Sequence, residues 1–216
     1  MKFGIIQDFA QEVAQYKDLA EQGNELAQFK LGECYKNGRG VEQDYAKAVY
    51  WYTLSAEQGN AKAQFDLAKC YFNGYGVDVD NAKATQYITM AAEQGYLHAQ
   101  VMLGARYRFG KGVGQAYDKA IYWLTRAADG GSSTAQCSLG LYYYYGTIVA
   151  QDYAKAVQWF TKAAGAGDAQ AQYELGACYY NGHGVDKDVD KAVVLWKRAA
   201  EQGNIEAEQA LQDITN

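Results

Sequence analysis

The stretch Glu57-Gln58-Gly59-Asn60-Ala61-Lys62-Ala63-Gln64, residues 57–64, decides the fold because the chain repeats it. Its Glu-Gln-Gly core returns at residues 21–23, 93–95 and 201–203. The glycine of this core recurs every 36 residues without an insertion, as Gly23, Gly59, Gly95, Gly131, Gly167 and Gly203. A fixed period of this length is typical of repeat proteins, in which stacked units share one continuous core.

Each 36-residue unit carries the pattern of two helices. In the first unit Ala27, Leu31 and Tyr35 follow at intervals of four, which is one stripe of a helix. Gly38-Arg39-Gly40 then predicts the end of this helix, since glycine accepts the left-handed conformation of a C-cap. Gly32 lies at the edge of the stripe, where its missing side chain lets a neighbouring helix approach. We expect helices of about 13–15 residues joined by short turns.

The second helix of each unit has its own start and apolar face. Asp44 predicts its N-cap, and Asn60 predicts the N-cap of the next first helix. Residues at intervals of 36 occupy equivalent positions, which we call a column. The column of Asp44 also holds Asp8, Asp80, Asp152 and Asp188. Among the large side chains of these helices, we expect four tryptophans to be buried: Trp51, Trp123, Trp159 and Trp196. A column of glutamines is expected to form hydrogen bonds between repeats: Gln28, Gln64, Gln100, Gln136 and Gln172.

Two units depart from the pattern at their central turn. Ala116 replaces the capping aspartate in the third unit. Gly146-Thr147-Ile148-Val149 replaces the Gly-x-Gly-Val of other units, so we expect a different backbone path there.

These segments resemble the Sel-1-like repeat family, relatives of the tetratricopeptide repeats. The resemblance rests on three recurring patterns: A-x-W-x-x-x-A-A-E-Q-G-N, A-Q-x-x-L-G-x-x-Y and G-x-G-V-x-x-D-x-x-K-A. It implies an all-α, right-handed α/α superhelical solenoid whose first helices line a concave side. It also implies a role as an interaction scaffold or adaptor, and no catalytic residues.

We expect one repeat domain over residues 1–216. It comprises an N-terminal half-repeat cap, 8–22, a C-terminal cap, 204–216, and five repeats between them: 24–58, 60–94, 96–130, 132–166 and 168–202. Glu12 and Gln15 stand where internal units have a buried alanine and a tryptophan. Polar side chains at stacking positions predict that this end faces water.

Composition narrows the class of partner. The net charge is −5 and no run of Lys or Arg occurs, which argues against nucleic acid and against anionic membranes. No apolar stretch is long enough to span a membrane, and residues 1–8 hold only a four-residue apolar run. We therefore expect a cytoplasmic protein, or a periplasmic or secreted one if a signal peptide has been removed. The sequence leaves the oligomeric state open.

Candidates for chemistry have simpler structural explanations. Gly110-Lys111-Gly112 lacks the G-K-[ST] of a phosphate loop and matches the repeated helix-ending turn. No repeat holds two cysteines, and equivalent positions in stacked repeats lie roughly 10 Å apart, beyond disulfide reach. We expect buried thiols at all four: Cys34, Cys70, Cys137 and Cys178. His98 and His183 lack catalytic or zinc-binding partners. We expect no metal, no cofactor and no enzymatic activity.

One group of side chains is not explained by the scaffold. By analogy with tetratricopeptide repeats, first-helix positions 26, 29, 30, 33, 36 and 37 of each unit face the concave side. Down the units these sites become apolar and aromatic, with an occasional arginine, which is the composition of a protein-binding hot spot. We predict that the partner-binding residues are Phe65, Phe72, Met102, Arg108, Phe109, Leu141, Tyr144, Tyr145, Tyr173 and Tyr180. The alternative is that these rings only pack on one another.

The sequence thus predicts a scaffold that binds a peptide or a partner protein in its concave groove, with Arg106 and Arg108 setting orientation. An inhibitor of the immunity type, which would neutralise a specific partner enzyme with the same groove, is the alternative. No acidic insert that reaches out of the groove favours that alternative. An enzyme is the least favoured class because the chain shows no nucleophile with a base, no metal-ligand set and no phosphate loop.

Overall fold

The computed structural model describes the backbone of residues 2–215 and the side chains of residues 9–214. Twelve α-helices and no strand occur in this part of the chain, so the predicted all-α repeat fold is confirmed. The helices are α1 (Lys2–Glu21), α2 (Glu25–Asn37), α3 (Tyr45–Glu57), α4 (Ala61–Asn73), α5 (Asn81–Glu93), α6 (Leu97–Phe109), α7 (Tyr117–Asp129), α8 (Ser133–Tyr145), α9 (Tyr153–Gly165), α10 (Ala169–Asn181), α11 (Val189–Glu201) and α12 (Ile205–Thr215).

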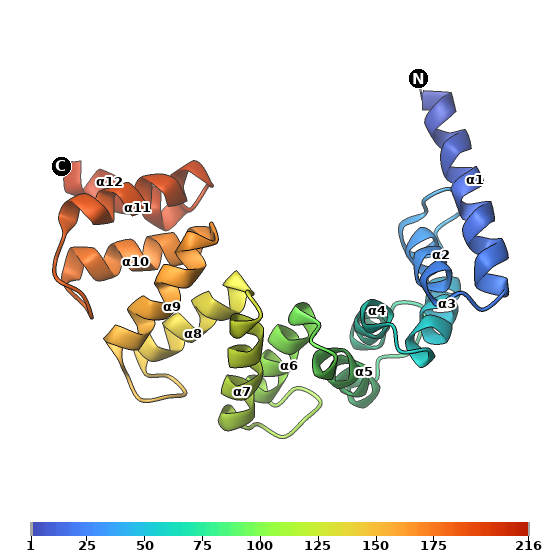
Figure 1. Cartoon of the computed structure of the whole chain (residues 1–216), viewed down its shortest axis with the longest axis horizontal. Coiled ribbons are helices and arrows are strands. Elements are labelled where there is room, and N and C mark those ends of the chain that lie inside the picture. The colour runs from blue at the N-terminus through green and yellow to red at the C-terminus, as the bar shows by residue number, and fades with distance from the viewer. Residues whose placement is uncertain (1, 216) are drawn as a thin grey trace. The chain divides into compact units, whose positions relative to one another are not determined.

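The helices form two compact units. The first comprises residues 1–116 with α1 to α6, and the second comprises residues 117–216 with α7 to α12. Within each unit, even-numbered first helices alternate with odd-numbered second helices, and consecutive helices pack on one another (Figure 1). The single domain and the repeat boundaries that the sequence suggests stay predictions.

The helix ends follow the capping residues. Gly38, Gly74, Gly110, Gly146 and Gly182 end the first helices in the left-handed conformation, as predicted. Asp44, Asp80, Asp152 and Asp188 accept backbone N–H groups at the starts of second helices, and Asn60 does so for α4. The prediction for Asp8 is wrong, because α1 begins at Lys2 and places Asp8 inside the helix; its side chain lies outside the described ones.

The turn of the fourth repeat differs as expected. Gly40, Gly76, Gly112 and Gly184 have positive φ angles of 70–75°, whereas no described residue other than glycine has a positive φ. Ile148 therefore cannot follow the path of those four glycines. The reason for glycine there is a close approach: a Cβ on Gly184 would lie 2.4 Å from the Tyr153 carbonyl oxygen.

The core lies between first and second helices. Two columns fit each other: small residues at the position of Gly32 face large ones at the position of Tyr52. A Cβ on Gly32 would lie 2.6 Å from the Tyr52 ring, and one on Gly140 would lie 2.5 Å from the Phe160 ring. The close helix approach predicted for Gly32 is thus confirmed.

The tryptophans are less uniform than predicted. Trp123 and Trp196 are buried, but Trp51 and Trp159 are only half-buried, so that part of the prediction is wrong. Trp196 is buried because it occupies the neighbouring column, which it shares with Tyr52 and Phe160.

The N-terminal cap agrees in part with the prediction. Gln15 is exposed. Glu12 is half-buried, and it accepts hydrogen bonds from the Tyr16 hydroxyl and from Arg39, each over 2.9 Å. Glu12 thus meets polar partners from its own helix and from the turn that follows α2.

Candidate protein-binding surface

The predicted binding residues lie on the first helices, on what we call the first-helix face. It consists of the side chains at positions 26, 29, 30, 33, 36 and 37 of the first unit and at every 36th residue onward. In residues 1–116, Phe65 is half-buried beside Tyr96, with ring centroids 5.2 Å apart, and Met102 is also half-buried. Phe72 and Phe109 are exposed. The Arg108 guanidinium lies 4.8 Å from the Phe109 ring.

Arg106 does not belong to this face, and its predicted role in orienting a partner is wrong. Its side chain is buried, with Nε donating to Thr85 Oγ1 over 2.9 Å and a second nitrogen 3.3 Å from the Asn81 carbonyl oxygen. Burial lowers the pKa of Arg106. The residues 36 positions earlier are Cys70, the equivalent of Arg106, and Val49, the equivalent of Thr85. The polar pair therefore replaces an apolar pair in the core.

In residues 117–216 the predicted residues divide into two groups, and the first packs inward. Leu141 and Tyr144 pack against the cluster around Phe160, and Tyr173 packs against the cluster around Trp196. The Tyr144 hydroxyl lies 2.9 Å from His183 Nδ1, and burial raises the pKa of Tyr144 to about 12. For these three residues the self-packing alternative describes the contacts well.

The second group, Tyr145 and Tyr180, is exposed. Tyr145 is 59% exposed and touches Tyr144 with the ring centroids 4.9 Å apart. Three other repeats carry asparagine at the position of Tyr145: Asn37, Asn73 and Asn181. Asn73 and Asn181 bond the carbonyl four residues back in their own helix. An asparagine thus satisfies this position structurally, and the helix does not need an aromatic ring there.

Sequence reasoning missed Glu174, a buried carboxylate on the same face. Glu174 is 7% exposed, and its Oε1 accepts a hydrogen bond from Gln170 over 2.9 Å. Gln170 in turn accepts from Asn204, the residue before α12, so the carboxylate is held from two helices. Burial raises the pKa of Glu174. Among the described residues, no Lys or Arg forms an ion pair with it.

A signal for Glu174 was present in the sequence. The equivalent carboxylate in residues 1–116 is Asp66, which is paired with Lys36 at 3.4 Å and with Lys69 at 3.3 Å. The residues equivalent to these two lysines are Tyr144 and Ala177. The loss of both cations leaves the carboxylate of Glu174 beside tyrosines. Desolvation by burial, together with the charge of Glu174, raises the pKa of Tyr145 and of Tyr173.

The cysteines and His183, the other residues considered for catalysis or metal binding, are packed among neighbouring side chains. All four cysteines are buried, as predicted, and they occur as free thiols. His183 lies between Tyr144 and Tyr153, with its ring stacked on Tyr153 at 4.6 Å. The described residues contain no group of three His, Cys, Asp or Glu side chains that could hold a metal ion. None of the helices in this part of the chain is long and apolar enough to cross a membrane.

Comparison with known families decides the classification. The Sel1 repeat family model matches five consecutive segments: residues 26–60, 61–96, 97–132, 133–168 and 169–204. The chain belongs to the Sel1 repeat family. Sel1 repeat proteins are protein-interaction scaffolds, and the family is in general non-enzymatic.

Solved structures of other Sel1 repeat proteins are similar throughout. A protective antigen of uropathogenic Escherichia coli with an SLR fold has a TM-score of 0.91 and 39% identity over 95% of this chain and 44% of its own. A Sel1 repeat protein from Oxalobacter formigenes has a TM-score of 0.86 and 37% identity over 94% of this chain and 58% of its own. The chain thus spans about half the length of these two proteins.

A more distant likeness concerns the fold alone. An immunity protein from Pseudomonas aeruginosa has a TM-score of 0.59 and 20% identity, over 92% of this chain and 75% of its own. No curated protein matches the sequence significantly.

Proposed function

We propose that this Sel1 repeat protein binds a partner protein or peptide on its first-helix face, and that residues 117–216 contribute the main contacts. The observation that carries the proposal is Tyr145, a ring left 59% exposed where other repeats have asparagine. Tyrosine is among the residues most enriched at binding hot spots, since it buries a large rigid surface and keeps a polar end.

Glu174 gives this surface a chemical preference. A buried carboxylate without a cation costs folding free energy, so stability does not account for it. A Lys or Arg side chain of the partner would neutralise it, and the neighbouring Tyr145 and Tyr173 rings would lie beside the incoming cation. Residues 1–116 offer a different first-helix face, in which Lys36, Asp66 and Lys69 line a 180 Å³ pocket and both lysines pair with the one carboxylate.

Of the predicted residues, Tyr145 and Tyr180 stay in the proposed site on residues 117–216, together with Glu174. On residues 1–116, Phe72, Arg108 and Phe109 stay proposed contacts of their own. Leu141, Tyr144 and Tyr173 would support it from behind. Phe65 and Met102 are half-buried and would add a smaller contact area. We place the protein in the cytoplasm as part of the same proposal, since its buried thiols suit a reducing compartment.

The experiment exchanges residues within their own columns. The partner is first isolated by affinity capture from the source cell and identified by mass spectrometry, and then titrated against purified variants. Tyr145→Asn and Phe109→Asn introduce the residue of the other repeats, so we expect an unchanged fold. Loss of a hot spot costs at least about 2 kcal/mol, and we therefore expect the Kd to rise roughly thirtyfold for Tyr145→Asn.

Tyr50→Gln is the matched control. Tyr50 lies on the second helix α3 and is 58% exposed, and its column holds Gln86 and Gln158 in other repeats. We expect this variant to bind as wild type. Binding that survives the two asparagine variants but fails in Tyr50→Gln would move the interface to the second helices and reject the proposal.

The inhibitor hypothesis stays second. At 20% identity, the likeness to an immunity protein supports the fold and not the activity. It would gain support if the captured partner were an enzyme whose turnover falls when the chain binds.

A further inference from the structure

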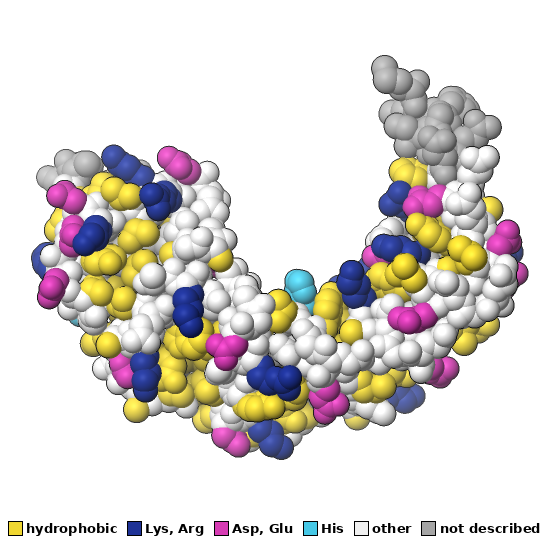
Figure 2. All heavy atoms as spheres, in the orientation of Figure 1, with side chains coloured by type: hydrophobic (Ala, Val, Ile, Leu, Met, Phe, Trp, Pro, Cys, Tyr) yellow, Lys and Arg dark blue, Asp and Glu magenta, His cyan; other side chains and the backbone are white. Residues whose placement is uncertain are grey.

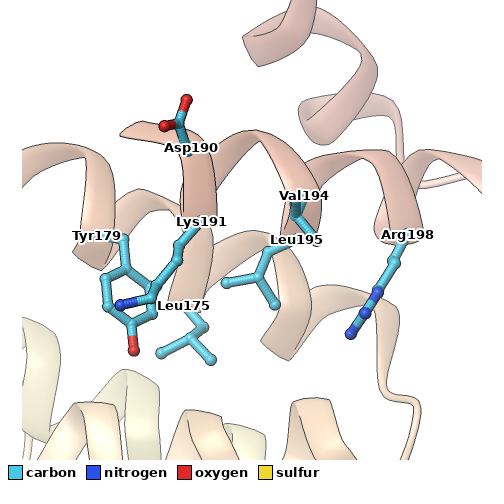
Figure 3. Close-up of a pocket in the computed structure, with 7 residues that line it drawn as sticks. All are labelled: Leu175, Tyr179, Asp190, Lys191, Val194, Leu195 and Arg198. Atoms are coloured by element: carbon cyan, nitrogen blue, oxygen red, sulfur yellow. The ribbon is translucent and has the colours of Figure 1, made fainter. Parts of the chain in front are cut away.

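A hollow of about 380 Å³ lies between α10 and α11. Figure 2 shows a patch of hydrophobic side chains over these two helices, bordered by Lys, Arg, Asp and Glu. Leu175 and Tyr179 of α10 and Val194 and Leu195 of α11 supply the apolar wall, and Arg198 stands at one end (Figure 3). The volume lies in the range of about 300–1,000 Å³ that is usual for binding pockets.

The repeat register explains why the hollow exists. The position of Leu195 holds an aromatic residue in every earlier repeat: Trp51, Tyr87, Trp123 and Trp159. Trp51 packs against the cluster that contains Leu31, beside Tyr35. Leu31 and Tyr35 are the equivalents of Leu175 and Tyr179, two of the residues that line the hollow. The shorter Leu195 therefore leaves open the place that an indole ring fills in the first repeat.

The cation that accompanies the ring in the third and fourth repeats is still present. At the equivalent position the Arg126 guanidinium lies 5.4 Å from the Trp123 ring, and Lys162 Nζ lies 4.3 Å from the Trp159 ring. Arg198 occupies this position in the last repeat, where no ring lies beneath it. Arg198 also forms no ion pair with a described residue.

The second cation at the hollow has partners of its own. Lys191 Nζ is 2.9 Å from Asp188 Oδ2 and 5.3 Å from the centroid of the Tyr179 ring. The Asp190 carboxylate points away from Leu175 and Leu195 in Figure 3. Of the two cations at this site, Arg198 is thus the one that forms no ion pair with a described residue and has no ring beneath it. A guanidinium without a carboxylate is well suited to stack on an aromatic ring.

We propose that this hollow binds an aromatic side chain, tryptophan or tyrosine, of a partner protein. The ring would lie on Leu175, Tyr179 and Leu195, in the place of the missing indole, with the Arg198 guanidinium over its face. A ring buried in a pocket under an arginine has the usual form of an interface anchor. This site lies between the first helix α10 and the second helix α11, and none of its lining residues belongs to the first-helix face.

The test uses N-acetyl-tryptophanamide as the probe and N-acetyl-leucinamide as its apolar control. Each is titrated into the full chain while NMR follows the methyl groups of Leu175 and Leu195 and the Nε–H of Arg198. We expect saturable shifts with a Kd on the order of 1 mM for the tryptophan probe, and at least severalfold weaker binding of the leucine probe.

Variants tie the binding to the hollow. Leu195→Trp restores the residue of the other repeats, and we expect it to abolish binding of the probe. Arg198→Gln should weaken binding severalfold, whereas Arg126→Gln, whose ring Trp123 is already in place, should leave it unchanged.

Any one of these results would overturn the proposal: no saturable shift, equal affinity for the leucine probe, or binding that survives Leu195→Trp. Binding that is indifferent to Arg198→Gln would remove the cation from it and leave only an apolar contact, which also contradicts the assignment. None of these outcomes bears on Tyr145 or on the first-helix face.

Discussion

Glutamine side chains form a hydrogen-bonded ladder through the repeats. Gln28 Nε2 donates to the Ala20 carbonyl oxygen over 3.1 Å, and Gln28 Oε1 accepts from Gln58 Nε2 over 2.7 Å. The Gln64–Gln94 and Gln172–Gln202 pairs repeat the second bond at 2.8 and 2.9 Å. The hydrogen bonds between repeats that the sequence predicted for Gln28 and its equivalents are confirmed. The part played by Gln58 and its equivalents was not predicted.

Two rungs of the ladder are missing, at Gln100 and at Gln136, and restoring the second should stabilise the protein. Gln136 Oε1 is buried without a hydrogen-bond partner, because Ala166 stands at the position of Gln58 and Gln202. The backbone of Ala166, with φ −82° and ψ 3°, matches that of Gln58, with φ −80° and ψ −2°. We expect Ala166→Gln to raise the free energy of unfolding by about 1 kcal/mol.

Chemical denaturation of the variant and of Gln202→Ala measures both directions of this effect. Gln202→Ala removes an existing rung and should destabilise by a similar amount. If Ala166→Gln were neutral while Gln202→Ala destabilised, the amide of Gln136 would already be satisfied, and the rung would not be missing.

At the scale of the element, pairs of helices approach closely wherever a small residue faces a large one. The first and second helices carry Gly32 against Tyr52 and Gly140 against Phe160. In another repeat the same two positions hold Ala68 and Ile88, both fully buried. A larger residue on one helix thus accompanies a smaller one on the other, which keeps the core close-packed.

This complementarity predicts the outcome of Gly140→Ala. The added methyl group would lie 2.5 Å from two ring atoms of Phe160, and overpacking of this kind costs about 1–3 kcal/mol. The better helix propensity of alanine offsets at most about 1 kcal/mol. We expect a net destabilisation, and we expect Phe160→Ile in the same chain to relieve it, because that pair copies Ala68 and Ile88.

Gly165→Ala is the control for this prediction, since nothing lies within 4 Å of the added methyl group at that helical position. It should be neutral or stabilising in the same thermal and chemical denaturation. A double variant no more stable than Gly140→Ala alone would show that the ring does not set the clash.

At the scale of the whole molecule, the 36-residue period predicted the features that all repeats share. It did not predict the contacts of single side chains that differ from one repeat to another. The columns of alanine, leucine, glycine and capping aspartate gave the helix pairs and their ends, because one residue type serves the same contact in each copy. They could not separate Tyr144 from Tyr145, neighbours about 100° apart on one helix. Tyr144 turns to His183, whereas Tyr145 stays exposed, and only the packed neighbours decide between these outcomes.

The same limit applies to charge. From the sequence, Arg106 is expected to be a surface cation. In the structure it is a core residue whose buried side chain donates a hydrogen bond to Thr85. Glu174 reads as a surface anion, but the replacement of two lysines by Tyr144 and Ala177 leaves it buried and without an ion pair. Comparing each column with its partner column, rather than reading columns singly, would have indicated both.

The reactivity of the cysteine thiols can be used to test the proposed cytoplasmic location. All four are buried, and burial raises the pKa of Cys137 and of Cys178 to about 12 and that of Cys70 to about 11. Because the thiolate is the reactive form, the native protein should react slowly with a thiol reagent at neutral pH. The rate should rise with pH, since a higher pH populates the thiolate, and it should rise sharply on unfolding, since unfolding removes the burial.

Thiol counting under denaturing, non-reducing conditions on protein purified without reductant should then return four free groups. Rapid modification of the folded chain would show that these sites open readily, in conflict with their burial in the helix pairs. A count of two or none would mean that cysteines from different repeats pair, which the spacing of roughly 10 Å between stacked repeats forbids in the native fold. Such a count would require either a rearranged chain or bonds between molecules, and it would favour an oxidising compartment over the cytoplasm.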